Sequence, residues 1–255
     1  MSSEPFRRLA LPDGTELAYW AVEGRGPGVV FLGGFGSDMT GEKARALEAH
    51  CRARGRAFVR FDYFGHGASG GAFREGTVGR WAADAVAVLD ALTRGPQVLV
   101  GSSLGGWLMV LAARARPERV EGLVGVAAAP DFSEDLLWAR LDGASRERLE
   151  RAGVLLVPNP YGEEPTVVTR ALIEDGRRHL VLRGPIPIRC PVRLLHGLAD
   201  PDVPWETSVR LARALASEDV TVTLVKGGGH RLSEPEDLTR LCAAVEELCG
   251  RGTGP

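Results

Sequence analysis

The sequence lacks the features that mark disulfide-bonded, metal-binding, membrane-spanning and nucleic-acid-binding proteins. Its four cysteines, at positions 51, 190, 242 and 249, form no C-x-x-C pair and no cluster with the spacing of metal ligands, which favours reduced thiols. No apolar run approaches the length of a membrane span, and the arginines are interleaved with acids instead of forming a basic stripe. We therefore expect no bound metal or cofactor, no membrane span and no nucleic acid partner.

The chain also has little excess charge and no readable targeting segment. Its 31 basic and 33 acidic side chains give a formal net charge of −2, and 44% of its 255 residues are hydrophobic. The first eight residues, Met1 to Arg8, contain no apolar segment of the kind found in a secretory signal. This composition is typical of one domain with an insertion. We expect a cytoplasmic protein.

Strand-like and helix-like segments alternate along most of the chain. Apolar runs are followed by helical patterns, as where Val78, Trp81 and Ala85 begin a core-facing stripe at three- and four-residue steps. Such alternation predicts an α/β fold, with a mainly parallel twisted sheet and helices on both of its faces. The helical patterns fall at residues 41–54, 77–92, 104–115, 204–216 and 235–249.

A glycine-serine turn at residues 101–105 has the pattern G-x-S-x-G. The apolar run 96–100 leads into it and a helical pattern leaves it, which is the context in which this pattern marks a nucleophile elbow. Ser103 lies at the centre of the turn, between two glycines. Ser102 is instead flanked at the matching positions by Val100 and Leu104. The sequence therefore predicts Ser103 as a nucleophile.

A serine nucleophile needs a histidine base and an acid that orients the histidine, here expected in the order Ser, acid, His. Asp200 follows the strand-like run 191–196, and His230 follows the strand-like run 220–225. Loops at the carboxyl ends of parallel strands gather at one edge of a sheet. Ser103, Asp200 and His230 are therefore the expected catalytic residues.

Two other acids compete with Asp200 for the orienting role. Asp202 lies two residues further along the same loop, so one of the two acids would orient the histidine and the other would be a solvated or cap-forming neighbour. Asp131 follows the strand-like run 120–128, although the segment after it makes helix capping its simpler role. The position in the loop favours Asp200.

The other four histidines have simpler explanations than catalysis. His50 lies in a helical pattern and His179 in a charged segment, where solvation is expected. His66 lies in a glycine-rich loop, and His196 ends a strand-like run just before a glycine. Packing at strand ends accounts for these last two.

Two backbone N–H groups are expected to hold the oxyanion that forms when the serine attacks a carbonyl. Leu104 follows the nucleophile at the start of its helix. Phe35 lies in a glycine-rich loop that follows the apolar strand 29–32. A phosphate-binding role for this loop is disfavoured, because no G-K-[ST] follows Gly33 or Gly36 and the spacing does not fit G-x-G-x-x-G.

Longer stretches around these positions resemble a known family. The chain is similar to the α/β-hydrolase superfamily and, within it, to the palmitoyl-protein thioesterases and acyl-glucuronide esterases of animal mitochondria called α/β-hydrolase domain-containing proteins. The stretches that carry the resemblance are residues 36–41, 60–63, 95–109, 190–197, 203–205 and 230–231.

The resemblance implies an α/β-hydrolase core formed by residues 1–130 and 187–255. The alternation of strands and helices breaks in residues 131–186, which we call the lid region and expect to be a small helical lid inserted over the active site. It carries a charged helix-like run at 140–151, an apolar patch at 154–157 and a helical pattern at 166–180. Within it Phe132, Leu137 and Trp138 either line an acyl pocket or form a small lid core.

The resemblance also implies hydrolysis of acyl thioesters or carboxylic esters, on a small-molecule or protein-linked acyl substrate. The family's catalytic triad falls on Ser103, Asp200 and His230, the residues already reached from spacing and context. No transit peptide is readable before the domain, in keeping with the expected cytoplasmic location. A receptor or sensor of the same fold with little turnover is the alternative interpretation.

Overall fold

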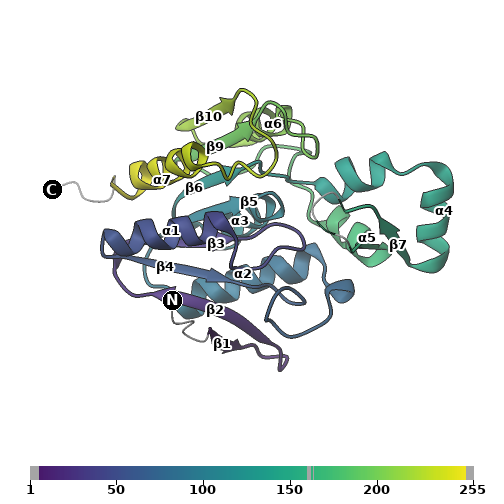
Figure 1. The fold of residues 1–255 in the computed structure, drawn as a ribbon, viewed down its shortest axis with the longest axis horizontal. Helices are drawn as coiled ribbons and strands as arrows, with labels where there is room; N and C mark the ends of the chain where they lie inside the picture. The colour runs from purple at the N-terminus through teal and green to yellow at the C-terminus, as the bar shows by residue number, and fades with distance from the viewer. Residues whose placement is uncertain (1–5, 160–161, 163, 251–255) are drawn as a thin grey trace.

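An eight-stranded sheet runs through the core of the computed structural model, which describes residues 6–159, 162 and 164–250 (Figure 1). The strand order is β1-β2-β4-β3-β5-β6-β9-β10. β1 and β2 form an antiparallel hairpin and β2 runs antiparallel to β4, whereas every pairing from β4 to β10 is parallel. The strands are β1 (Arg7–Ala10), β2 (Glu16–Val22), β3 (Arg25–Leu32), β4 (Arg56–Phe61), β5 (Gln97–Ser102), β6 (Val120–Val126), β9 (Val192–Gly197) and β10 (Val220–Val225).

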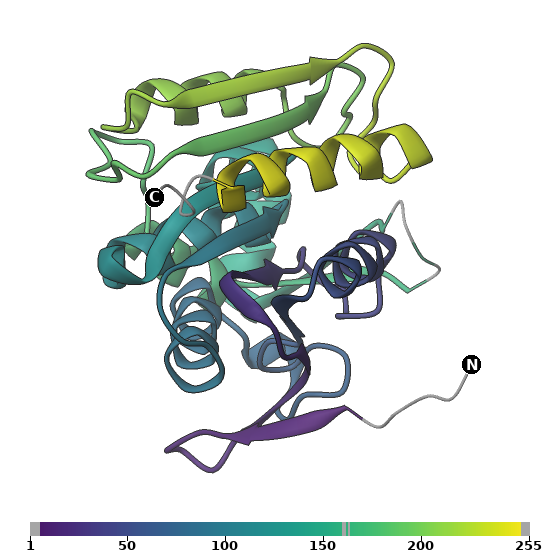
Figure 2. The same cartoon turned by 90° about the vertical axis from the view of Figure 1, so that its left-hand side faces the viewer.

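Helices cover both faces of this sheet, which confirms the predicted α/β fold with a mainly parallel sheet. In Figure 2, α1 and α7 lie on one side of the sheet and α2 and α3 on the other. No helix in the described part of the chain is long and apolar enough to cross a bilayer. The helices of the core are α1 (Glu42–Ala53), α2 (Val78–Leu92), α3 (Leu104–Ala115), α6 (Glu206–Ala214) and α7 (Pro235–Gly250), with 3₁₀ turns at Phe73–Glu75 and Pro117–Arg119.

The two faces of β5 explain why this strand is apolar throughout. Val98 and Val100 point toward the cluster that includes Leu47 of α1 and Val245 of α7. Leu99 points the other way, into the cluster that contains Trp81 and Trp107 of α2 and α3. Every residue of β5 is buried, as expected for a central strand covered on both faces. This burial holds the carboxyl end of β5, where Ser103 follows, at a fixed place.

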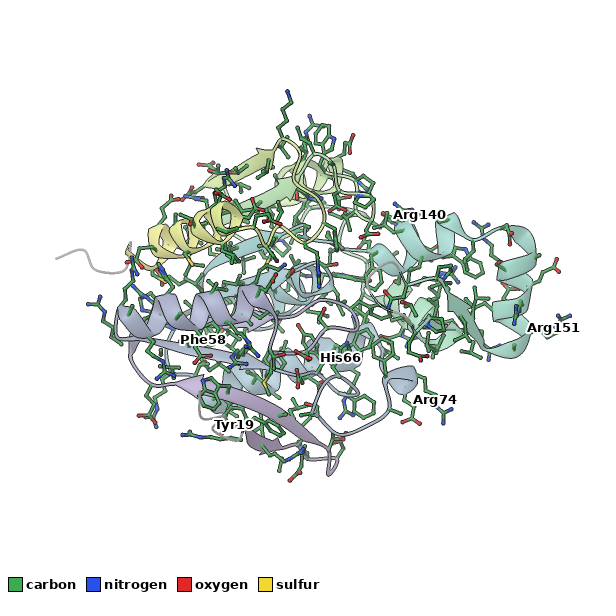
Figure 3. All side chains as sticks on the ribbon, in the orientation of Figure 1. Tyr19, Phe58, His66, Arg74, Arg140 and Arg151 are labelled. Carbon is green, nitrogen blue, oxygen red and sulfur yellow. The ribbon has the colours of Figure 1, made fainter. Side chains whose placement is uncertain are left out.

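The lid region projects from one end of the molecule (Figure 1). It has a small apolar cluster of its own, made by Leu149, Leu155, Val168 and Ile173. Figure 3 shows the charged side chain of Arg151 on its outer surface. Its elements are a π-helical turn (Ser133–Trp138), α4 (Gly143–Ala152), β7 (Val154–Val157), β8 (Thr166–Thr169) and α5 (Arg170–Arg178).

One expected helix in the lid region is partly wrong. The pattern at 166–180 begins as strand β8, which pairs antiparallel with β7, and only Arg170–Arg178 is helical. The β-branched residues of the Thr166–Thr169 segment favour an extended backbone, and the apolar patch at Val154–Val157 supplies the partner strand. The lid region is therefore a hairpin flanked by helices.

Asp131 joins the two ends of the lid region. Its buried carboxylate accepts hydrogen bonds from the backbone N–H groups of Val181 at 2.7 Å and Leu182 at 2.9 Å, and the Arg183 guanidinium lies 3.5 Å away. Burial raises the pKa of Asp131, against the lowering effect of these two hydrogen bonds. Asp131 thus stabilises the junction of the lid region with the core, and it makes no contact with Ser103 or His230 among the hydrogen bonds of the described residues.

The turn between β5 and α3 allows no side chain at its two glycines. A Cβ at Gly101 would stand 2.3 Å from the Gly105 carbonyl oxygen, and a Cβ at Gly105 would stand 2.1 Å from the Leu32 carbonyl oxygen. These are backbone atoms, so no side-chain rotation relieves the clash.

We expect Gly105→Ala to lower the free energy of unfolding by roughly 1–3 kcal/mol or more, because β3 or α3 must move to admit the methyl group. Urea unfolding followed by circular dichroism measures the change. Gly143→Ala is the control, since a Cβ there meets no atom within 4 Å, and it should stay within about 1 kcal/mol of the parent protein. Equal stability of both variants would contradict the steric argument.

Candidate active site

Three loops at the carboxyl ends of the sheet's strands bring Ser103, Asp200 and His230 together. Ser103 follows β5, Asp200 follows β9 and His230 follows β10. His230 Nε2 lies 3.1 Å from Ser103 Oγ, and His230 Nδ1 lies 2.8 Å from Asp200 Oδ2. These distances are those of hydrogen bonds, so the three side chains form one continuous chain.

Ser103 has a strained backbone. Its φ of 53° and ψ of −116° lie in a region that L-residues rarely adopt, at a cost on the order of 1–3 kcal/mol. Backbone hydrogen bonds hold it there: its N–H donates to Val126 O at 2.9 Å, and its carbonyl accepts from Gly106 and Ala129. In this conformation the Ser103 hydroxyl lies within hydrogen-bond distance of His230 Nε2.

Asp200 is almost fully buried, yet it is held as a carboxylate. Oδ1 accepts the backbone N–H groups of Asp202 and Val203, both at 2.9 Å, and Oδ2 accepts from His230. Burial opposes ionisation, but the hydrogen bonds, from His196 and His230 above all, outweigh it and keep the pKa of Asp200 well below its ordinary value.

The competing acid Asp202 makes different contacts. Its backbone N–H donates to Asp200, and its carbonyl accepts from the Arg140 guanidinium at 2.9 Å. One ligand atom each of Asp200, Asp202 and His230 lies within 4.8 Å of the others, a grouping that a metal ion could use. Both ring nitrogens of His230 already face Asp200 and Ser103, however, so the imidazole has no nitrogen left for an ion.

The loop that carries Phe35 packs directly against the serine. A Cβ at Gly34 would stand 3.6 Å from the Cβ of Ser103. The Phe35 ring packs against Phe73, Trp81 and Phe132, with ring centroids 5.0 to 5.7 Å apart. Within the described residues no protein acceptor takes the Phe35 N–H, and the N–H of a first helical residue such as Leu104 has no partner inside its helix.

The buried side chain of His66, labelled in Figure 3, contacts the backbone of the same loop. Its Nε2 lies 3.2 Å from the Gly36 N–H and its Nδ1 lies 3.1 Å from Phe64 O, so Nδ1 carries the proton and Nε2 accepts. Burial lowers the pKa of His66, which favours this neutral form. The packing role expected for His66 thus includes holding the backbone beside Phe35.

His196 lies closer to the three hydrogen-bonded side chains than its strand-end position indicated. The ring is fully buried, with Nε2 3.0 Å from Val203 O and 3.2 Å from Asp200 Oδ2. Its Nδ1 lies 2.7 Å from Ser208 Oγ on α6. His50 and His179 lie elsewhere, beside Glu246 and Asp175.

A cavity of about 800 Å³ opens over Ser103 and His230. The loops after β3 and β4 form one part of its wall, and the lid region contributes Asn159 and the segment 164–167. Phe132, Leu137 and Trp138 are not among the described residues that line it; Phe132 packs in the main core and Trp138 against Arg146 and Arg177. A second groove of about 850 Å³, between α1 and α7, includes none of the three catalytic candidates.

Lys43 also lines the cavity, although no motif in the sequence marks it as a site residue. Its ammonium donates to Arg231 O and to Ser233 Oγ, the latter at 3.2 Å, in the segment that follows His230. Burial, with the nearby Arg231 charge, lowers the pKa of Lys43 to about 8. In the sequence, Lys43 is one of several charged residues in the amphipathic pattern of α1.

Several known proteins are similar to this chain in sequence and in fold. Palmitoyl-protein thioesterase ABHD10, mitochondrial, from Bos taurus is 44% identical over 241 residues, covering 94% of this chain and 78% of that protein. The structure of mouse alpha/beta hydrolase domain-containing protein 10 has a TM-score of 0.90 at 40% identity, covering 98% of this chain and all of the other. A solved structure from Agrobacterium vitis S4 has a TM-score of 0.91 at 40% identity, covering 96% and 100%.

These relatives correct the expected location. Five mammalian relatives at 42 to 44% identity are named mitochondrial, which contradicts the expectation of a cytoplasmic protein. That expectation came from composition and from the opening residues, and neither of these identifies the compartment in which a folded hydrolase works.

The family model supplies the remaining comparison. The alpha/beta hydrolase family model matches residues 29–241, a span that runs from β3 into α7 and contains the three hydrogen-bonded side chains. The resemblance stated from the sequence is therefore confirmed. The chain belongs to the alpha/beta hydrolase family and is a hydrolase.

Proposed function

We propose that this hydrolase cleaves acyl thioesters or carboxylic esters with Ser103 as nucleophile, His230 as base and Asp200 as the acid that orients the base. The observation that carries the proposal is the continuous hydrogen-bonded chain from Ser103 Oγ through His230 to Asp200. The cavity above Ser103 gives a substrate access to the nucleophile.

In the first half of the reaction, His230 Nε2 takes the Ser103 proton as Oγ bonds to the acyl carbonyl carbon. The imidazolium then donates this proton to the departing oxygen or sulfur, and the acyl group stays on Ser103. In the second half, a water loses a proton to His230 and attacks the acyl-enzyme. Ser103 leaves as an alkoxide and regains the proton from His230, so the enzyme returns unchanged.

Asp200 supports both halves because it stabilises the imidazolium. Its Oδ2 accepts a hydrogen bond from His230 Nδ1–H, with 2.8 Å between the two heavy atoms. This bond orients the ring so that Nε2 faces Ser103. Its lowered pKa means that it stays ionised when His230 is charged. The N–H groups of Phe35 and Leu104 are the proposed oxyanion donors, supported by the packing of the Phe35 loop against Ser103.

The lid region (residues 131–186) is proposed to choose among acyl substrates, while residues 1–130 and 187–255 supply the chemistry. Segment 164–167 and Asn159 line the same cavity as Ser103, so a substrate in this cavity contacts the lid region. The related proteins named palmitoyl-protein thioesterases make long acyl thioesters the first substrates to test.

Ser103→Ala should abolish hydrolysis of p-nitrophenyl butyrate and labelling by a fluorophosphonate probe, because no other side chain replaces the activated hydroxyl. Ser102→Ala is the matched control, since Ser102 is the neighbouring serine outside the hydrogen-bonded chain, and it should keep its labelling. Labelling retained in the Ser103 variant would show that another residue is the nucleophile.

Asp200→Asn should lower kcat by roughly four decades with little change in KM, since the amide favours the wrong histidine tautomer. Asp202→Asn keeps the backbone N–H that donates to Asp200, so its kcat should fall by less than about tenfold. Steady-state kinetics on one ester compares the two. A larger loss in Asp202→Asn would reverse the assignment of the acid.

Val167→Phe should change the acyl-chain preference, because Val167 lines the cavity and a larger side chain shortens the space for the acyl group. We expect kcat/KM for the dodecanoate ester, relative to the acetate ester, to fall roughly tenfold or more. Val154→Phe is the control, at an exposed position of the same hairpin outside the cavity. The profile is measured with p-nitrophenyl esters of graded length and the matching acyl thioesters. An unchanged profile would remove the lid region from substrate choice.

A further inference from the structure

A second histidine contacts the acid of the proposed triad. Asp200 Oδ2 lies 2.8 Å from His230 Nδ1 and 3.2 Å from His196 Nε2. The two imidazoles therefore share one carboxylate oxygen, while the other oxygen accepts two backbone N–H groups. Asp200 has four donors in an almost fully buried site, and His196 is the donor that the triad chemistry does not require.

The neighbours of His196 determine which of its nitrogens carries a proton. Nε2 faces two acceptors, the Val203 carbonyl at 3.0 Å and the Asp200 carboxylate, and neither group can donate. A bare nitrogen there would face two oxygen lone pairs, so Nε2 must carry the proton. Nδ1 lies 2.7 Å from Ser208 Oγ, a hydroxyl that can donate or accept.

Three separate elements hold the His196 ring. The residue belongs to β9, its Nδ1 contact comes from α6, and Val203 lies in the loop between them. The ring is fully buried, and Ser208 is only 1% exposed. Its N–H therefore reaches Asp200 from a rigid support, whereas Asp200 itself lies in a loop.

We propose that His196 is a positioning residue that holds the Asp200 carboxylate so that Oδ2 faces His230. This inference rests on the proposed function, because the acid matters only if His230 acts as a base. Without the His196 donor, Oδ1 keeps its two backbone N–H groups, but Oδ2 is held by His230 alone and the carboxylate can turn further about its side-chain torsion. His230 then loses the orientation that directs Nε2 to Ser103.

Two amide variants separate positioning from packing. In His196→Gln the side-chain amide reaches as far as the imidazole Nε2 and can still donate to Asp200. In His196→Asn the amide reaches only the position of Nδ1, so it can contact Ser208 but not Asp200. Both variants are polar, but Asn is one methylene smaller than Gln and leaves the larger void at this buried site, so the free energy of unfolding of each variant is measured beside its kcat. His50→Gln is the control, the same change at a histidine that contacts Glu246 outside the cavity.

We expect kcat for p-nitrophenyl butyrate to fall by about 10- to 100-fold in His196→Asn, with KM within twofold, as is typical when the support of a functional side chain is lost. His196→Gln should keep kcat within about fivefold, and the His50 control should match the parent enzyme. Equal kcat values for the Gln and Asn variants, whether both high or both low, would overturn the positioning role.

A second measurement needs no substitution at His196. In protein labelled with 15N-histidine, NMR should detect a proton on His196 Nε2, and its resonance should move upfield in Asp200→Asn as the carboxylate acceptor is lost. An unprotonated Nε2, or a resonance unmoved by Asp200→Asn, would overturn the inference. Fluorophosphonate labelling in the parent protein tests the proposed function separately, because its absence would leave both NMR results intact.

Discussion

The backbone of α3 passes so close to the end of β3 that a Cβ at Gly105 would stand 2.1 Å from the Leu32 carbonyl oxygen. This contact holds the start of α3 beside the loop that carries Phe35. Ser103 and both proposed oxyanion donors therefore have a common support. Donors held in place in this way are the kind that stabilise developing charge most effectively.

Asp200 has to remain ionised although its side chain is buried. Two backbone N–H groups and two imidazoles surround its carboxylate, and these donors outweigh the cost of burial. These donors come from the loop after β9, from β9 itself and from the loop after β10. The buried carboxylate thereby connects β9, the loop after β10 and α6 to the hydrogen-bonded chain that ends at Ser103.

The sequence predicted the parts of the site that depend on local order. G-x-S-x-G between a strand and a helix, and single acids or histidines just after strands, place Ser103, Asp200 and His230 at one edge of a parallel sheet before any coordinate is known. The roles of His196 and Lys43 could not be predicted in this way. His196 lies only four residues before Asp200, but the course of the intervening loop decides whether its ring faces that carboxylate. Lys43 lies in a helix far along the sequence from Ser233, and only the fold brings the two together beside the cavity. The hairpin of β7 and β8 was missed for a related reason, because a four-residue strand next to a helix gives too short a pattern to separate from the helix itself.

The bonds from Asp131 to Val181 and Leu182 have a consequence for how this protein can vary. They bring the entry and the exit of a segment of about fifty residues side by side, so the segment leaves and rejoins the core at two adjacent points. It also contacts the core between these points, because the Asp175 carboxylate accepts the Gly79 N–H and Trp107 Nε1 donates to His179 O. Changes of length or sequence between these points add little loop-closure cost, which grows only slowly with the number of residues. A chimera with a relative should therefore be joined at this pair of points, and it should keep the pairs through which the segment contacts the core, such as Asp175 with Gly79.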